Sequence, residues 1–149
     1  VEQLLVLNSS VPSYTLAGRI YSKLGQIDKA QQYFSQINQN EAVIYYSAQS
    51  YLNNNQTQKG VSLLRRYLKR YEGTYLSHKL LSSLYVDAGS LDRAHIHNAK
   101  ALVRQGKLDS AIDRYERAKA TTSSQDLFDV INVEIDRLES KIDLYKELP

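Results

Sequence analysis

The three histidines are the first residues to consider for chemistry, because imidazole ligates metals and transfers protons near neutral pH. They are His78, His95 and His97. The last two are separated by one residue, and on a helix this spacing turns their side chains about 200° apart, so they cannot ligate one metal ion. The sequence also lacks the H-E-x-x-H, G-x-S-x-G and phosphate-cradling glycine motifs. We therefore predict no catalytic residue, no metal ligand and no cofactor.

A second candidate is the run Arg65-Arg-Tyr-Leu-Lys-Arg-Tyr71, which interleaves cations with aromatic residues. Such a run is typical of nucleic-acid binding, because cations contact phosphates while aromatic rings stack on bases. On a helix, however, Tyr67 and Leu68 would face inward, and the cations would lie on the outer face. We favour this solvated helix face and predict no nucleic-acid partner; its cations are Arg65, Arg66, Lys69 and Arg70.

A repeated pattern indicates the elements that would position these side chains. The run Tyr14-Thr-Leu-Ala-Gly-Arg-Ile-Tyr21, then Ala30 and Phe34, follows the spacing of the tetratricopeptide repeat, W-x2-L-G-x2-Y…A-x3-F. Small residues at these intervals let two helices pack closely, and the rings fill the space beside the crossing. We therefore predict an all-α tetratricopeptide-repeat superhelix of helix-turn-helix units. The later copies use Ala48, Tyr51, Gly60 and Leu64, then Tyr85, Gly89 and Ala94, then Ala99, Leu102, Gly106, Ala111, Tyr115 and Ala118.

The turns between the paired helices also recur. Gly25, Gly89 and Gly106 each precede an apolar residue and an aspartate that would open the next helix. Glycine at this point predicts a helix end with positive φ, and the run Asn53-Asn-Asn55 would supply the same conformation in the remaining unit.

The spacing of the last two turns is compressed. Gly89 and Gly106 are 17 residues apart in the sequence, whereas one repeat takes about 34 residues. We interpret the segment 91–104 as a helix shared by two units; the alternative is that residues are missing between these turns. The domain prediction is a single domain over 1–149, with a remnant of a preceding helix at 1–10, a loop from Asn8 to Pro12, units at 12–38, 42–71, 75–104 and 95–120, and a capping helix at 124–147.

The expected capping helix carries apolar residues at helical intervals along one stripe. A repeat array must cover the apolar face of its last unit, which this helix would do. The alternative is a coiled-coil contact with another chain. The residues of the stripe are Leu127, Ile131, Glu134, Leu138, Ile142 and Tyr145, with Ile135 beside them.

Composition limits the classes of protein. The 149 residues contain no cysteine, which excludes disulfides and thiolate metal sites, and no apolar run long enough for a membrane helix. The net charge of +3 is divided unevenly, with 9 Lys/Arg against 4 Asp/Glu in residues 1–80 and 10 against 12 in residues 81–149. A basic first half would favour an acidic partner or an anionic surface, although solvated helix faces also explain it. The run Val1 to Leu7 looks like the end of a preceding helix, and together with the absence of methionine it suggests a fragment of a longer protein. No signal peptide is recognisable, and in a fragment it would lie outside this sequence.

The expected binding surface is the groove lined by the first helix of each unit. Polar and cationic side chains there could hold an extended peptide or its acidic side chains. They do not match the lysine–asparagine clamp that some repeats of this kind use for a C-terminal carboxylate. We also expect Ile96 in this groove. The predicted protein-binding residues are Arg19, Lys23, Tyr45, Gln49, Asn53, Lys79, Ser83, Lys100 and Arg104.

Residues 42–147 resemble a narrower family. The segments Leu84 to His95, Asn98 to Ile112 and Ile131 to Glu139 are similar to the C-terminal repeat domain of bacterial periplasmic zinc metalloproteases of the BepA type. The resemblance implies a periplasmic module that docks substrates or complexes, with outer-membrane β-barrel proteins or their assembly machinery as partners and a protease domain nearby. The protease motif is absent from this sequence, so no catalytic or zinc residue follows from the resemblance. The alternative is a stand-alone scaffold of a secretion or envelope assembly, and without the resemblance we expect a cytoplasmic protein.

Overall fold

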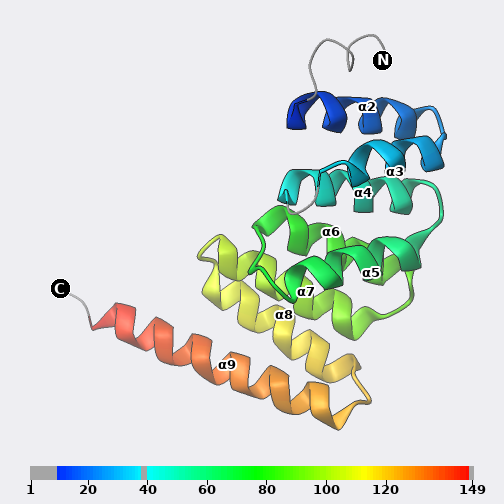
Figure 1. Ribbon diagram of the computed structural model, residues 1–149. Helices are drawn as coiled ribbons and strands as arrows, with labels where there is room; N and C mark the ends of the chain where they lie inside the picture. The colour runs from blue at the N-terminus through cyan, green and yellow to red at the C-terminus, as the bar shows by residue number, and fades with distance from the viewer. Residues whose placement is uncertain (1–9, 38–39, 148–149) are drawn as a thin grey trace. The chain divides into compact units, whose positions relative to one another are not determined.

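The computed structural model describes residues 10–37 and 40–147, and every element in these ranges is an α-helix (Figure 1). The all-α repeat fold predicted from the sequence is confirmed. The predicted remnant helix at 1–10 lies almost wholly outside the described residues. The helices are α2 (Val11–Lys23), α3 (Ile27–Ser35), α4 (Glu41–Asn53), α5 (Thr57–Leu68), α6 (Tyr75–Asp87), α7 (Leu91–Arg104), α8 (Leu108–Thr121) and α9 (Gln125–Lys146).

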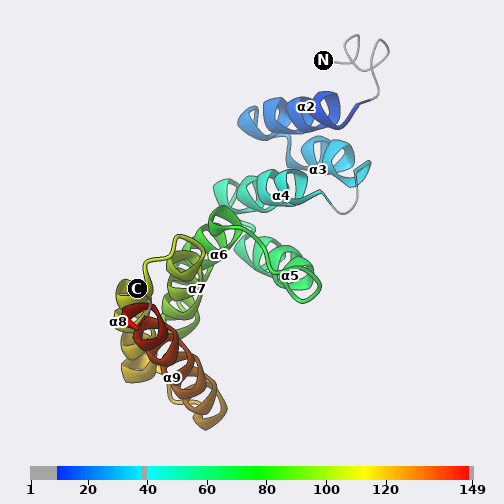
Figure 2. The same cartoon turned by 90° about the vertical axis from the view of Figure 1, so that its left-hand side faces the viewer.

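The helices divide into two compact units, Val1–Gly73 and Thr74–Pro149. In the first, α2 packs on α3 and α4, and α4 also packs on α3 and α5. In the second, α7 packs on both α6 and α8, and α9 packs on α8. Both views show α8 and α9 side by side (Figure 1; Figure 2). The double contact of α7 is the arrangement that a shared helix requires, while the assignment of the whole chain to one domain stays a prediction.

Local sequence signals set the helix starts. Asn40 accepts a hydrogen bond from the Val43 N–H at 3.3 Å, and Ser124 accepts one from the Leu127 N–H at 3.4 Å. Each side chain satisfies an amide that has no partner within its own helix. The loop predicted from Asn8 to Pro12 is wrong at its end, because α2 already begins at Val11. Proline is tolerated in a first turn, where its missing N–H would have had no helical acceptor.

All four turns between paired helices have the same hydrogen-bonded geometry. Gly25, Asn55, Gly89 and Gly106 have φ of 72°, 56°, 73° and 72°, which confirms the predicted left-handed positions. The residue after each donates its N–H back to the carbonyl five positions earlier, with donor–acceptor distances of 2.8–3.0 Å. This is the Schellman motif, in which the last helical carbonyls find donors. Its acceptors are the repeat positions Tyr21, Tyr51, Tyr85 and Leu102.

Asn55 gives a direct test of this turn. Changing Asn55 to alanine should lower the free energy of unfolding by about 1 kcal/mol, because only glycine and asparagine adopt positive φ at low cost. Asn55→Gly should be neutral or slightly stabilising. Urea unfolding of both variants, followed by circular dichroism, measures the difference. Equal midpoints for the two variants would contradict the assigned strain at this position.

The cores lie between the paired helices. In the first unit, Phe34 and Ala30 of α3 pack with Tyr21 and Val43, and all four are buried. In the second, Tyr115 lies in a cluster contributed by α7, α8 and α9. Thr122 also donates a hydrogen bond to Asp92 Oδ2 at 3.1 Å, which ties the end of α8 to the start of α7. The second cluster comprises Ile96, Ala99, Leu108, Ala111, Tyr115, Ala118, Ile131, Ile135 and Leu138.

The predicted apolar stripe of α9 is only partly correct. Ile131, Ile135 and Leu138 are buried against α8, as expected of a cap, but the Tyr145 side chain is 54% exposed. The reason is length, since α9 has 22 residues and α8 only 14. None of the helices in residues 10–37 and 40–147 has both the length and the apolar character required to cross a membrane.

Candidate protein-binding site

The predicted groove residues of the first unit lie on two packed helices. Arg19 and Lys23 come from α2, and Tyr45, Gln49 and Asn53 come from α4, which packs against α2. Arg19, Lys23 and Asn53 are exposed, whereas Tyr45 and Gln49 are partly buried. The unit therefore presents polar and cationic side chains on adjacent first helices, although no observation tests their binding role.

Arg19 also has a contact within its own unit. Its guanidinium lies over the ring of Tyr46, 4.4 Å from the centroid, and Tyr46 packs edge-on against Tyr45. A cation over an aromatic ring at an exposed position contributes roughly 0.5–1 kcal/mol. Arg19 therefore contributes to the packing of α2 on α4, and a substitution there would change stability as well as binding.

The predicted groove residues of the second unit lie on α6 and α7. Lys79, Ser83, Lys100 and Arg104 are all exposed. The Ser83 hydroxyl donates back to the Lys79 carbonyl at 3.2 Å, so it is partly used within its own helix. The side chains of Lys79 and Lys100 form no ion pair with any residue that the structure describes.

The expectation that Ile96 faces the groove is wrong. Ile96 is only 9% exposed and packs in the cluster that α7 forms with α8 and α9. A helix that contacts partners on two sides has a wider buried surface than a helix at the end of a stack. The position that the simple repeat pattern assigned to the groove is therefore part of the core.

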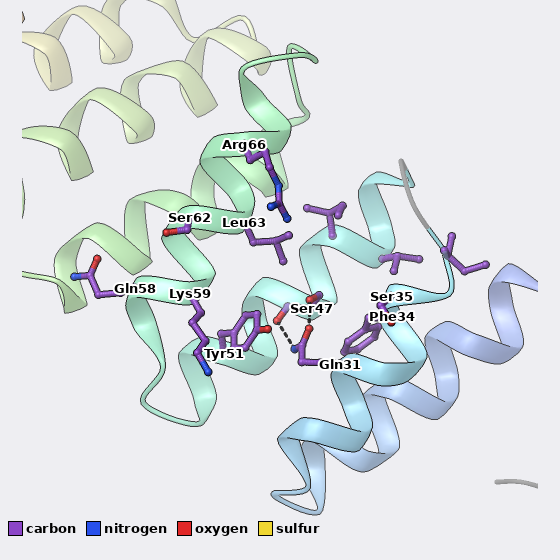
Figure 3. A pocket seen from close by; sticks show the side chains of 13 residues that line it. Gln31, Phe34, Ser35, Ser47, Tyr51, Gln58, Lys59, Ser62, Leu63 and Arg66 are labelled. Carbon is purple, nitrogen blue, oxygen red and sulfur yellow. Dashed lines mark hydrogen bonds between the residues drawn. The ribbon is translucent and has the colours of Figure 1, made fainter.

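The first unit contains a pocket that was not predicted from the sequence. It has a volume of about 520 Å³ and lies among α3, α4 and α5 (Figure 3). The pocket is lined by α4 and by α3 and α5, which are the second helices of the two repeats in this unit. The prediction from the sequence considered only first helices. Its floor is apolar and consists of Phe34, Ile37, Val43, Ile44 and Leu63.

One wall of the pocket is polar and internally bonded. The Ser47 hydroxyl donates to Gln31 Oε1, and Gln31 Nε2 donates to the Ser47 carbonyl at 3.2 Å (Figure 3). These two bonds join α3 to α4 and fix the width of the pocket at this point. Tyr51 lines the pocket beside them, and burial, followed by the nearby Asp28 charge, raises the pKa of its phenol. The phenol can donate and accept hydrogen bonds in the pocket.

The opposite edge of the pocket belongs to α5 and is cationic. Lys59 and Arg66 line the pocket, and Arg65, Arg66 and Lys69 with Ser62 line an adjoining hollow of about 280 Å³. We refer to Lys59, Arg65, Arg66 and Lys69 as the basic strip. All four side chains are exposed, as the sequence predicted for the last three. The signal that would have pointed to this edge is the lack of any Asp or Glu in α5.

The histidines form an unexpected pair. His78 of α6 and His97 of α7 approach with their Nδ1 atoms 3.1 Å apart, and the His97 ring also stacks on Tyr85 at 5.5 Å. His95 is not part of this contact, and burial, followed by the charges of Arg114 and Arg117, lowers its pKa. No group of three or more metal-ligating side chains occurs among the described residues.

Comparison with known families identifies the class of these helices. Residues 11–38 match one model of the tetratricopeptide repeat, and residues 42–74 match another. The two segments coincide with the pairs α2–α3 and α4–α5, and α3, α4 and α5 line the pocket. Such repeats use their surfaces to hold other proteins, so this part of the chain is a protein-interaction module.

Solved structures with a similar arrangement include several of the tetratricopeptide protein MamA. The P212121 form of MamA AMB-1 is 18% identical, with a TM-score of 0.44, over 89% of this chain and 86% of the other. The C2 form of MamA MSR-1 is 16% identical, with a TM-score of 0.41, over 90% of this chain and 87% of the other. A search of the curated proteins gives no significant match.

Proposed function

We propose that this chain is a non-catalytic docking module that holds a protein partner for a larger periplasmic protein, a zinc metalloprotease of the BepA type. The observation that carries the proposal is the pair of tetratricopeptide repeats at residues 11–38 and 42–74. The exposed Lys79 and Lys100, which have no ion pair among the described residues, support binding by first helices in the second unit as well. The sequence resemblance over residues 42–147 supports the envelope role.

The proposed partners are outer-membrane β-barrel proteins before they fold, or the machinery that assembles them. A pull-down with a urea-unfolded outer-membrane barrel, diluted into buffer with the immobilised chain, tests this directly. The double variant Lys79→Glu and Lys100→Glu should reduce capture by about tenfold. The two lysines would attract acidic side chains of the partner, and the two glutamates would repel them. Arg19→Glu is a less clean test, because it also removes the contact with Tyr46.

The control is Arg117→Glu, which makes the charge change of one of these two substitutions on α8, outside the predicted groove. It should leave capture unchanged. Circular dichroism of all variants should show the same helical melting curve. Equal capture by the parent chain and the double variant would place the binding site away from these first helices.

The envelope role has a separate test in the coding sequence upstream of Val1. A signal peptide and an H-E-x-x-H motif in the same reading frame are expected. A start codon directly before Val1 would contradict the metalloprotease proposal and favour a stand-alone scaffold. This outcome would leave the protein-interaction assignment of residues 11–74 intact.

A further inference from the structure

We infer that the pocket among α3, α4 and α5, together with the basic strip, binds an acidic segment of a partner protein that also carries an apolar side chain. The inference rests on the proposed function only in that the partner is a protein. It places a second binding surface on α3, α4 and α5, and none of the groove residues predicted from the sequence lines this pocket. The periplasmic location and the metalloprotease do not enter it.

The charge of the strip is the first part of the argument. Arg65, Arg66 and Lys69 have no ion pair with any described residue, and Lys59 donates only to the neutral Gln56 Oε1, at 2.9 Å. No Asp or Glu on α5 offsets these cations. Four cations without an ion pair among the described residues, gathered along one pocket edge, attract carboxylates and repel basic segments. The occupant that complements this edge is therefore acidic.

The position of Arg66 joins the charged edge to the pocket. Arg66 lines both the pocket and the adjoining hollow, so a carboxylate bound there can be followed by another along the strip. A guanidinium binds carboxylates through paired N–H donors, and Arg66 is the guanidinium that lines the pocket itself. The Tyr51 phenol lines the same pocket.

The apolar floor supplies the second half of the recognition. Phe34 and Val43 are the buried members of this floor, while Ile44 and Leu63 remain partly exposed in the pocket. The volume of about 520 Å³ lies in the range of sites that enclose a small ligand or a few side chains. An apolar side chain of the partner would remove Ile44 and Leu63 from water, and salt does not screen this contribution as it screens the attraction between charges.

The aromatic residues beside the strip favour a peptide over a nucleic acid. Single-stranded nucleic acids stack their bases on open aromatic faces. The nearest rings, Tyr67 and Tyr71, stack on each other with centroids 4.8 Å apart. Of the aromatic residues in the pocket, Phe34 is buried in the core and Tyr51 is covered on one side by the Lys59 ammonium, 5.9 Å from its centroid.

Fluorescence anisotropy with two labelled, end-blocked peptides tests the inference on the full chain. One peptide carries Asp and Glu around a central Phe and Leu, and the other has Asn and Gln in place of the acids. The acidic peptide should bind, and Arg66→Glu should weaken it by at least about tenfold, the effect of losing a charge-assisted contact. Leu63→Ala should weaken binding by about threefold to tenfold through lost apolar contact.

Two controls separate pocket binding from general attraction. Arg70→Glu makes the same charge change one turn beyond Arg66 but does not line the pocket, and should cost less than about threefold, as expected for a screened surface charge. Lys79→Glu with Lys100→Glu, the test of the proposed function, should leave the affinity for the acidic peptide unchanged. Failure of the barrel pull-down with retained peptide binding would thus remove the proposed partner but not this site.

Three outcomes would overturn the inference. The first is equal affinity for the acidic and the amide peptides. The second is an unchanged affinity after Arg66→Glu, or an equal loss after Arg66→Glu and Arg70→Glu. The third is a single-stranded oligothymidine that binds more tightly than the acidic peptide and is lost with Arg66→Glu, which would assign the strip to nucleic acid.

Discussion

Replacing Tyr115 with alanine should lower the free energy of unfolding by about 3–5 kcal/mol, the range for removing a large buried aromatic side chain. Tyr115 is 2% exposed and is surrounded by residues of α7, α8 and α9. Its burial, followed by the Glu134 charge, also raises the pKa of its phenol well above the ordinary value. The cavity left by the variant would lie at the centre of the cluster that holds these three helices together. Urea unfolding followed by circular dichroism measures the loss.

Two control variants make this test specific. Tyr115→Phe retains the ring and should cost much less than Tyr115→Ala, because most of the loss comes from ring packing. Tyr145→Ala removes the same side chain from a position that is 54% exposed, and should cost less than about 1 kcal/mol. Hydrogen exchange should show faster opening of the α8 amides only in Tyr115→Ala. Similar midpoints for Tyr115→Ala and Tyr145→Ala would contradict the described core.

Replacing Gly18 with valine should lower the free energy of unfolding by about 2–3 kcal/mol, as overpacking of a closed core does. A Cβ at Gly18 would lie 2.5 Å from Cε1 of Phe34 and 2.7 Å from Cδ1 and Cζ of the same ring. Phe34 is 3% exposed and is packed by Tyr21, Ala30 and Val43, so the ring has little room to move. The midpoint of urea unfolding again measures the effect.

A double-mutant cycle identifies the Phe34 ring as the cause. Gly18→Ala combines the same clash with a gain in helix propensity of about 1 kcal/mol over glycine. In the parent chain the clash should dominate and the variant should be less stable. In a Phe34→Leu background the ring edge is gone, and Gly18→Ala should become stabilising. If Gly18→Ala changed the free energy of unfolding in the same direction in both backgrounds, the contact with Phe34 would not require glycine.

The positions that the sequence predicted best are those that depend on one residue. The left-handed turns follow from the backbone freedom of glycine and asparagine, so Gly25, Asn55, Gly89 and Gly106 could be placed without knowing any packing partner. The small residue Gly18 and the ring of Phe34 follow from a spacing that is specific to this repeat. Their contact is therefore also visible in the sequence.

Features that depend on several elements could not be predicted in this way. Ile96 was assigned to the groove from its position in the shared helix, but α7 packs on both α6 and α8 and Ile96 is buried in the cluster with α8 and α9. Tyr145 follows the helical period of α9, yet the helix extends past the shorter α8. The pocket depends on how far α3 and α5 stand apart across α4, a distance that no periodicity contains. The run Arg65-Arg-Tyr-Leu-Lys-Arg-Tyr71 indicated the exposed cations of α5, but it did not indicate the pocket beside them.

The shared geometry of the four turns has a consequence for how such a chain can change. Each turn closes its helix with the same two backbone hydrogen bonds, whichever of glycine or asparagine occupies the left-handed position. The bonds use only main-chain atoms, so they are indifferent to the side chains of the helices that they join. A duplicated or exchanged unit joined at this turn would therefore already have hydrogen-bond donors for the last carbonyls of its helix. The surface chemistry of one unit, such as the cations of α5, could then be altered without redesigning the joint that connects it to the next helix.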